Sequence, residues 1–398
     1  MGRERFAYNR SMTMAAIALL VGVVAPDSLR VDVLSLLVPQ QVEIVCAHRT
    51  LELPNGGRLA PGSRLVLVRD GRDVIASAPG GWRWRGSGLA VGAPGERLSV
   101  DVRGRDSRTR VLPGPVEVGS DGVRLRVVAT YDLEAFVASA VAAELDQVVE
   151  PATLEAAAVT IRSYAVARPA RHEGEGVDVC DTTHCVHSRG LVEDATPAAG
   201  AARATRGLVL TSGGRVVPGY CTACCGGRTA TPSLLWGVED TGQHESIVCT
   251  ACSASRYYRW RRVVRTDAVV SAVEGLVGGR LGSDVDLREV AGPGAWVLAV
   301  VVRGGGRERR VGGDAFRMAV DRRLGWDSIP SPRFTIERRS GSLVIRGGGH
   351  GHGIGLCVAG AVARARRGAS RDAILTAYFP RARLQLLGAG PSVYSCLF

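Results

Sequence analysis

Lysine is absent from this 398-residue sequence, so all fifty of its basic residues are arginine. They outnumber the thirty-eight acidic residues and give a net charge of +12. The exclusive use of arginine is typical of a GC-rich genome, and the positive excess fits either a solvated surface or an anionic partner. Because a basic helix and an RNA-binding aromatic pattern are both missing, nucleic acid is not an expected partner. An anionic wall polymer or a membrane surface suits the charge better.

An apolar run long enough to cross a bilayer is also missing near the N-terminus. The run Met12–Ala25 is shorter than the roughly 20 residues that a spanning helix needs. Three arginines within the first ten residues precede it, which is the pattern of an export signal. Pro26 would hinder cleavage after the small residues before it, so residues 1–30 are either an export signal or a membrane anchor. We expect a protein of the cell envelope, secreted or membrane-anchored.

Internal repeats and low-complexity linkers are missing too, and 46% hydrophobic with 22% charged residues is a globular composition. Short runs of alternating apolar residues, separated by Pro-Gly and Gly-Gly turns, extend from Gln41 to about Val127. They predict a β-rich N-terminal region over residues 31–125, followed by a helix-and-sheet core over residues 126–398. The predicted fold class is therefore mixed α+β.

At Asp132 the apolar spacing changes from that of strands to that of helices. Pro151 fits the first turn of a second helix, running from about Ala152 to Ala167. Further helices are predicted near residues 266–277, 358–367 and 370–378.

Glu144 ends the first helical run on an Ala/Val-rich background. Desolvation raises the pKa of such a carboxyl and can keep it protonated near neutral pH, so that it can donate a proton to a glycosidic oxygen. A paired second carboxylate is missing, since Asp146 falls on a different helical face. This argues against a two-carboxylate hydrolase. The alternative reading of Glu144 is an ordinary surface side chain.

A loop dense in cysteine and histidine follows the second helix. Thiolate and imidazole are the usual zinc ligands, and the loop offers four or five of them within sixteen residues, at His172, Cys180, His184, Cys185 and His187. A disulfide between Cys180 and Cys185 is an equal alternative.

A second cysteine set has two C-x2-C elements, Cys221/Cys224 and Cys249/Cys252, with Cys225 beside the first. Their separation resembles that of a zinc ribbon. In an exported chain two disulfides fit equally well.

The run GGGHGHGIG at 347–355 lacks the Gly-Lys-Ser/Thr ending of a phosphate-binding loop. Glycines around His350 and His352 let the backbone approach a ligand closely and expose both imidazoles. The two histidines are candidates for binding sugar hydroxyls, or alternatively a metal.

Taken together, these segments resemble the SpoIID/LytB family (stage II sporulation protein D and amidase-enhancer relatives). They occur in the family's order and cover roughly residues 110–385. The matching segments are LEAFVASAVAAEL (133–145), TLEAAAVTIRSYAV (153–166), CDTTHCVHS (180–188), CCGGRTA (224–230) and GHGHGIGLCVAGA (349–361).

The resemblance implies a lytic transglycosylase that cleaves the MurNAc–GlcNAc bond of peptidoglycan and leaves 1,6-anhydro ends. By motif position the catalytic acid/base is Glu144. The zinc ion of some family members maps to His172, Cys180 and Cys185, with His184 as the fourth expected ligand. This ion would be structural, and no organic cofactor is expected. The residues expected to contact the glycan strand are Arg162, Ser163, Tyr164, Thr229, His350 and His352.

The sequence also departs from the family pattern. Ala157 replaces a Gln, His350 replaces a Trp, and Cys357-Val358-Ala359 replaces Ser-Gln-Tyr. If these positions line the groove, the contacts with glycan are reduced. The alternative function is therefore a wall-binding protein that stimulates an N-acetylmuramoyl-L-alanine amidase. A zinc-dependent hydrolase that uses His350 and His352 is a third reading.

Overall fold

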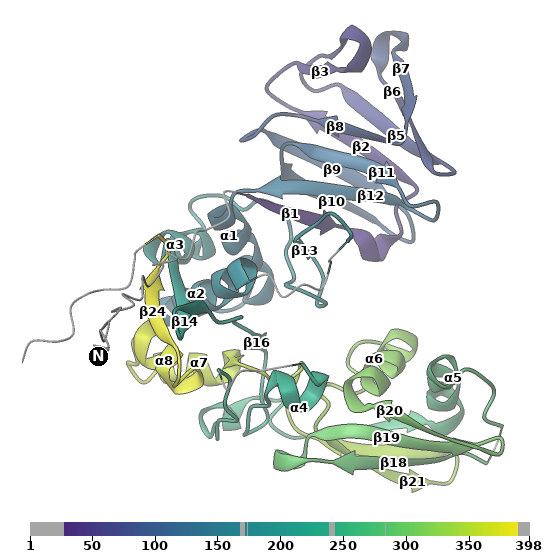
Figure 1. Cartoon of the computed structure of the whole chain (residues 1–398), viewed down its shortest axis with the longest axis vertical. Coiled ribbons are helices and arrows are strands. Elements are labelled where there is room, and N and C mark those ends of the chain that lie inside the picture. The colour runs from purple at the N-terminus through teal and green to yellow at the C-terminus, as the bar shows by residue number, and fades with distance from the viewer. Residues whose placement is uncertain (1–27, 168–171, 173, 239–242, 283, 389–398) are drawn as a thin grey trace, which may run out of the picture.

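The structure is a computed structural model that describes residues 28–167, 172, 174–238, 243–282 and 284–388. Most of the predicted export segment, residues 1–27, lies outside the described residues. Within the part described, no helix is both long and apolar enough to cross a membrane. The chain forms a β-rich region, a helical layer and an inserted α+β module (Figure 1). The predicted mixed α+β class is confirmed.

Two sheets make up the β-rich region. The first has the order β10 (Ser107–Pro113), β9 (Arg97–Arg103), β2 (Gln41–Cys46), β5 (Arg64–Asp70), β6 (Asp73–Ser77) and β7 (Arg83–Gly86). The second has the order β13 (Val179–Cys180), β1 (Leu29–Val33), β12 (Leu125–Tyr131), β11 (Val116–Ser120) and β8 (Gly88–Val91). A hairpin of β3 (Leu51–Leu53) and β4 (Gly57–Leu59) lies beside them.

Alternating burial in these strands follows from their period of two. In β9, Leu98, Val100 and Val102 are fully buried while their neighbours are partly or fully exposed. The apolar faces of both sheets contribute to one hydrophobic core, which continues without a break into the helices that follow.

The helical layer consists of α1 (Leu133–Glu144), α2 (Pro151–Ala167), α3 (Pro197–Ala204), α7 (Val358–Ala365) and α8 (Arg371–Tyr378). Helix α2 lies at its centre and contacts the other four. Twelve of its seventeen residues are buried. Its small side chains allow this close packing, since alanine fills six of the seventeen positions. A sheet of β15 (Arg215–Val216), β14 (Leu208–Ser212) and β24 (Arg383–Leu386) covers the same layer.

The inserted module occupies residues 260–347 and has its own hydrophobic core. One sheet has the order β17 (Trp260–Arg265), β22 (Ser342–Gly347) and β21 (Phe334–Arg339). The other has the order β18 (Asp286–Ala291), β19 (Val297–Gly304) and β20 (Arg307–Gly312). Helices α5 (Thr266–Val277) and α6 (Gly313–Leu324) pack on each other and on these strands (Figure 1).

Short elements join the module to the helical layer. The two-stranded ladder of β16 (Cys221–Thr222) and β23 (Leu356–Cys357) is parallel, and α4 (Pro232–Trp236) follows β16 in the chain. This ladder brings the Cys-rich segment and the Gly-His segment together, although residues 223–355 separate its two strands in the sequence.

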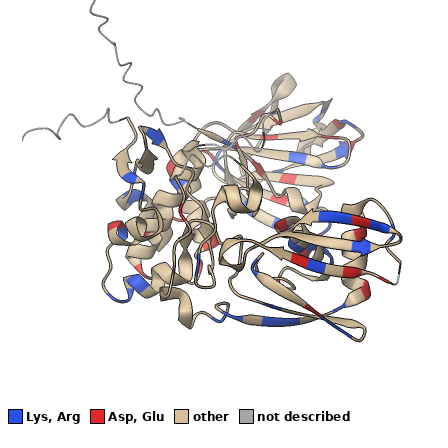
Figure 2. Ribbon diagram, turned by 60° about the horizontal axis from the view of Figure 1, so that its bottom comes forward, with Lys and Arg blue, Asp and Glu red and all other residues tan. Residues whose placement is uncertain are grey.

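Charged residues are spread over all parts of the fold (Figure 2). Basic and acidic positions are interspersed on many strands and helices.

Candidate active site

Glu144 is the last residue of α1. Asp132 begins this helix by accepting a hydrogen bond from the backbone N–H of Glu134 at 2.9 Å. The residues on either side of Glu144 are buried: Ala143 in the last turn of α1 and Leu145 directly after the helix. Glu144 itself keeps solvent-accessible surface. The helix end therefore presents one carboxyl to solvent from an otherwise apolar setting.

The surroundings of Glu144 raise the pKa of its carboxyl. The main cause is partial desolvation by the protein packed around the carboxyl, which disfavours the charged form. A hydrogen bond from the backbone N–H of His187 and the positive charge of Arg189 act in the opposite direction and are weaker. Among the described residues, the groups that shift this pKa include no carboxylate. Asp146, the nearest acid in sequence, pairs instead with Arg189 at 3.5 Å.

Two neighbours of Glu144 come from distant parts of the chain. The backbone N–H of His187 donates to Oε1 of Glu144 over 3.0 Å. The thiol of Cys221, in β16, lies close enough for the Glu144 carboxylate to raise the pKa of Cys221, in addition to the larger effect of burial. Glu144 therefore lies where α1, the Cys/His loop and the β16–β23 ladder meet.

The Cys/His loop brings four ligand-type side chains together. The ligand atoms of His172, Cys180, His184 and Cys185 all lie within 4.8 Å of one another. His172 Nε2 is 3.2 Å from Cys185 Sγ, and His184 Nδ1 is 3.7 and 3.6 Å from the sulfurs of Cys180 and Cys185. Around a tetrahedral zinc ion the distance between a nitrogen and a sulfur ligand is about 3.5 Å. The donor set and its spacing therefore fit Zn²⁺.

The outer side of this cluster also suits a metal site. The other ring nitrogen of His172 lies 3.2 Å from a carboxylate oxygen of Glu175. Such a carboxylate fixes the tautomer and orientation of a ligating histidine. Cys180 belongs to β13, which pairs with β1 through Val31 and Asp32. The cluster is thereby fixed to the edge of the β-rich region.

Only one residue, Val186, separates the cluster from the hydrogen bond to Glu144. Cys185 is a member of the cluster, and His187 is the donor to Glu144. Val186 is buried in the main core and anchors this link. The position of the donor to the acid therefore depends on the folding of the Cys/His loop.

An aromatic cluster lies next to the β16–β23 ladder. The ring of Tyr220 is in edge-to-face contact with Tyr164, Trp236 and His352, with centroid separations of 5.7, 5.3 and 6.2 Å. Trp236 also contacts His352 at 5.3 Å. Tyr220, Trp236 and His352 are each only partly buried. They offer aromatic surface next to Cys221 and hence close to the Glu144 region.

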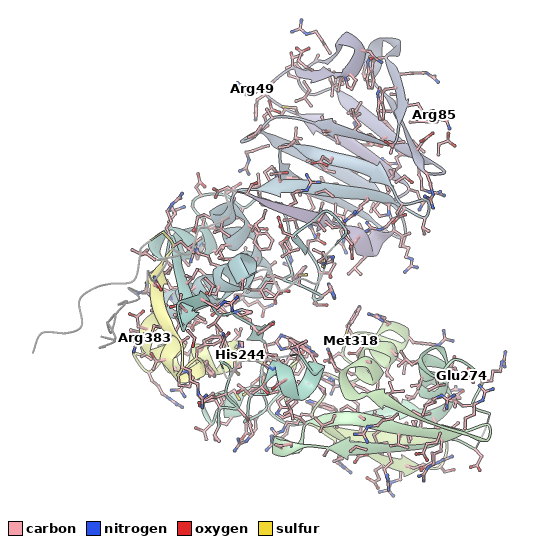
Figure 3. The ribbon with its side chains drawn as sticks, viewed as in Figure 1. Arg49, Arg85, His244, Glu274, Met318 and Arg383 are labelled. Atoms are coloured by element: carbon pink, nitrogen blue, oxygen red, sulfur yellow. The ribbon has the colours of Figure 1, made fainter. Side chains whose placement is uncertain are left out.

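His244 extends this aromatic cluster. Its ring lies 5.4 Å from that of Tyr220, and its Nε2 is 2.9 Å from the carbonyl oxygen of Pro218. Figure 3 shows His244 between the helical layer and α4. The cluster thus collects residues from α2, from the segment 220–244 and from the Gly-His segment.

Two glycines of the Gly-His segment are required by close packing. Gly353 has a φ of +81°, and a Cβ there would lie 2.0 Å from the ring of Trp296. Gly355 has a φ of +73°, and a Cβ there would lie 2.2 Å from the carbonyl oxygen of Tyr220. Because these two glycines have no side chain, the backbone directly before β23 can pass close to Trp296 and Tyr220.

Comparison with known proteins matches residues 121–212 to the family model of SpoIID, described as stage II sporulation protein. The matched segment contains α1, α2, the Cys/His loop, α3 and β14. This segment of the chain is similar to the SpoIID family. A search of curated proteins found no match to it. The SpoIID segment therefore includes Glu144 and the first cluster of ligand-type residues, while the aromatic cluster is completed by later parts of the chain.

Several SpoIID-motif residues that were expected to contact substrate are buried instead. Arg162 has no exposed surface. It forms a bidentate ion pair with Glu134, at 2.9 and 2.5 Å, and donates to the backbone oxygens of Ala202 and Leu208. Arg162 therefore connects α2 to α1, α3 and β14. Its burial does not fit the predicted role in substrate binding.

Ser163 and Thr229 have similar structural roles. Ser163 Oγ donates to the carbonyl oxygen of Val159 and accepts from the N–H of Leu210. Thr229 Oγ1 accepts from the N–H of Ile247 at 2.7 Å. Both side chains are buried, so their hydroxyls hold the backbone and do not face a glycan. Their contact with substrate stays a prediction that this burial does not favour.

The other three residues predicted to contact glycan, Tyr164, His350 and His352, lie in three different settings. Tyr164 is buried with 1% exposure, and its contact with the Tyr220 ring relates it to the site. His352 belongs to the partly exposed aromatic cluster. His350 lies elsewhere, stacked on Tyr257 at 4.2 Å with Nε2 3.8 Å from a carboxylate oxygen of Asp327. The structure therefore separates the two histidines that the sequence presents as a pair.

The separation also disfavours a metal site on His350 and His352. Among the described residues, two groups of ligand-type side chains converge, and neither includes these histidines. Burial lowers the pKa of His350.

The departures from the SpoIID motif fall mostly in the core. Ala157 and Cys357 have no exposed surface. Val358 and Ala359, at the start of α7, are partly buried. The loss of Gln and Ser side chains at 157 and 357 therefore does not remove contacts from a surface groove.

Sequence reasoning missed Tyr220, Trp236 and His187 as members of the site. Tyr220 and Trp236 flank the CCGGRTA segment, and their position beside this motif was a usable signal. His187 contributes through its backbone N–H. Side-chain chemistry in the sequence gives no sign of such a contact.

Proposed function

We propose that this protein is a peptidoglycan lytic transglycosylase in which Glu144 is the single acid and base. The observation that supports this most is the setting of Glu144: a solvent-accessible carboxyl with a raised pKa and no carboxylate among the groups that shift it. A hydrolase of the two-carboxylate type needs a second acid group across the scissile bond. A lyase that uses an internal hydroxyl needs only one.

The proposed reaction has two proton transfers through the same carboxyl. Protonated Glu144 donates its proton to the glycosidic oxygen as the bond between C1 of MurNAc and O4 of GlcNAc breaks. The resulting carboxylate then takes the proton of the MurNAc 6-hydroxyl as O6 bonds to C1. The products are a 1,6-anhydroMurNAc end and a free GlcNAc 4-hydroxyl, and Glu144 is protonated again. Water is neither consumed nor released.

The His187 N–H has a defined task in this cycle. It donates to Oε1 of Glu144, so it orients the carboxyl and favours its charged form. That charged form is the base of the second step. Partial desolvation favours the protonated form, which is the acid of the first step. The two opposing effects suit a group that must act in both states.

The Cys/His cluster would hold a zinc ion through His172, Cys180, His184 and Cys185. With four protein ligands the coordination shell is closed, so the ion would be structural. The cluster sets the path of the loop that carries the His187 N–H to Glu144.

The aromatic cluster would bind the glycan strand. Tyr220, Trp236 and His352 combine ring faces with polar atoms and are partly exposed. Aromatic side chains of this kind pack on apolar ligand faces and use their polar atoms for hydrogen bonds. The arginine excess and the export-type N-terminus agree with work at an anionic cell envelope, with membrane contact through the N-terminal segment.

The test is to digest purified sacculi, and glycan strands stripped of stem peptides, with the purified protein in water enriched in ¹⁸O. Mass spectrometry should show fragment ends that are lighter than hydrolytic ends by one water and carry no ¹⁸O. Reducing MurNAc ends that carry ¹⁸O would show a hydrolase and overturn the proposal. Binding to sacculi without products, together with faster cleavage by an added amidase, would instead select the amidase-stimulating alternative.

A further inference from the structure

Four buried cysteines lie together where β23 (Leu356–Cys357) ends, apart from the Cys/His cluster. They are Cys225, Cys249, Cys252 and Cys357, and their sulfur atoms all lie within 4.8 Å of one another. We propose that these four thiolates bind one zinc ion, in a second metal site separate from the Cys/His cluster. We call them the four-cysteine site.

The spacing of the sulfurs selects a single ion. With Zn–S bonds of about 2.3 Å, sulfurs at the corners of a tetrahedron are about 3.8 Å apart. Cys225 Sγ and Cys252 Sγ are 3.6 Å apart, and no pair exceeds 4.8 Å. A disulfide needs about 2.05 Å between its sulfurs. Four thiolates at the corners of a tetrahedron are the ligand set of a closed structural zinc site.

The groups around the sulfurs resemble the outer shell of a thiolate site. The backbone N–H of Cys225 points to Cys357 Sγ at 3.3 Å. The hydroxyl of Tyr378 lies 3.2 Å from Cys249 Sγ. Such donors stabilise the negative charge on metal-bound sulfur and orient the ligand.

Positive charge is also close to this buried site. Four thiolates and one Zn²⁺ have a net charge of −2, which burial makes costly unless it is compensated. The guanidinium of Arg364 lies over the Tyr378 ring, 5.7 Å from its centroid. Arg333 and Arg259 both donate to the carbonyl oxygen of Gly226, the residue after Cys225. Cys357 itself precedes the first residue of α7, where the helix dipole favours negative charge.

The site would join three segments that are distant in sequence. Cys225 follows β16, Cys249 precedes the short 3-10 helix Ala251–Ala254, Cys252 lies within it, and Cys357 ends β23. The inserted module, residues 260–347, lies in the chain between the second and the third of these segments. A metal ion there would close the loop formed by the module and hold β23 beside β16, next to the aromatic cluster. Closing so long a loop removes much of the entropy of the unfolded chain.

The ligand set differs from the one that the sequence spacing suggests. Zinc-ribbon spacing selects Cys221 and Cys224 as partners of Cys249 and Cys252. The structure places Cys221 beside Glu144 and recruits Cys225 and Cys357 instead. It also gives a reason for cysteine at 357, where the family motif has serine. Cys221 is therefore a sharp control for the ligand assignment.

The experiment measures zinc and free thiols per chain in the full-length protein, purified without added chelator, for the wild type and four variants. The wild type should hold about two zinc ions. Cys249→Ser and Cys357→Ser should each lose one ion, and so should the Cys/His-cluster variant Cys185→Ser. Cys221→Ser should keep both. Cobalt loaded into the wild type should give the absorption of two different tetrahedral sites, one of four sulfurs and one of two sulfurs and two nitrogens.

The cobalt spectrum and the thiol count use only the wild-type protein, so they decide the question even if a variant fails to fold. Thiols of Cys225, Cys249, Cys252 and Cys357 found oxidised in a protein with one zinc ion would overturn the proposal in favour of two disulfides. Iron with inorganic sulfide would overturn the single-ion assignment. Loss of the second ion in Cys221→Ser would overturn the choice of ligands. None of these readouts depends on glycan cleavage.

Discussion

The backbone N–H of His187 donates to Oε1 of Glu144 over 3.0 Å, and His187 follows the cluster residue Cys185 by two positions. A side-chain acid on α1 and a loop with ligand-type residues are thereby coupled through one hydrogen bond. In the proposed enzyme, this contact lets a structural site influence the acid without touching the substrate.

Arg189 should tune the pH dependence of cleavage. Its positive charge lowers the pKa of Glu144, against the larger effect of desolvation. Activity needs the protonated acid, so the rate should fall as pH rises through the Glu144 pKa. Arg189→Gln removes the charge, raises this pKa and should move the falling limb to higher pH by roughly half a unit or less.

The measurement is the pH profile of anhydro-product release from sacculi. Arg85→Gln is the matched control, because Arg85 belongs to β7 in the β-rich region, where Figure 3 labels it. Its profile should coincide with that of the wild type. A shift to lower pH in Arg189→Gln would contradict the electrostatic assignment.

Removal of zinc from the Cys/His cluster should lower the stability of the fold, and it should slow cleavage only as a consequence of that loss. If zinc is present at about a thousand times its Kd, its loss costs roughly 4 kcal/mol of folding free energy. His172→Ala should therefore lower the thermal midpoint and slow cleavage only as far as the loop loses its structure. A chelator that stopped cleavage at once, with the fold intact by circular dichroism, would indicate a catalytic metal.

Arg162 should contribute strongly to folding. Its guanidinium is fully buried and pairs with Glu134. Arg162→Met leaves that carboxylate without its partner, and breaking a buried ion pair costs about 3–5 kcal/mol. Arg366→Met, which breaks the exposed pair of Arg366 with Glu150, should cost less than about 1 kcal/mol. Urea unfolding of both variants checks this, and equal losses would rule out the structural role of Arg162.

Much of the secondary structure could be predicted from the sequence because it depends on local periodicity. The expected helix at 266–277 coincides with α5, and the expected second helix coincides closely with α2. Helix α6 was not predicted. Five of the twelve residues in its sequence, GDAFRMAVDRRL, are charged, and burial of Phe316 and Val320 against the inserted module's sheet stabilises it. Tertiary packing of this kind is not visible in a short window.

The site was less predictable, for two physical reasons. Motif membership does not distinguish a side chain that meets substrate from one that is buried under it, as Arg162 and Ser163 show. Contacts across large sequence separations depend on strand register. The pairing of Cys221 with Leu356 in the β16–β23 ladder brings the two motif segments together, and no local pattern specifies that register.

Asp321 should make the stability of the inserted module depend on pH. Burial raises the pKa of Asp321 to about 7, while the N–H of Ile329 and the charge of Arg317 oppose this. The folded state therefore binds a proton that the unfolded state releases at lower pH. Stability from this group is fully present below about pH 4 and is lost as pH rises toward about 7.

Asp321→Asn keeps an oxygen acceptor for the Ile329 N–H and removes the titration. The variant should lose this part of the pH dependence in urea unfolding between pH 4 and 7 and be more stable than the wild type at pH 7. An unchanged slope, or a variant less stable at pH 7 than at pH 4, would refute the assignment.

Cleavage of purified sacculi by Glu144→Gln, compared with Asp146→Asn, tests the central claim most directly. Both changes convert one carboxyl at the end of α1 into an amide, but Asp146 is exposed and pairs with Arg189. Glu144→Gln should lose at least about a hundredfold in the release of 1,6-anhydro products, as expected for loss of a general acid and base. Asp146→Asn should retain most of the activity. Full activity in folded Glu144→Gln protein would contradict the account.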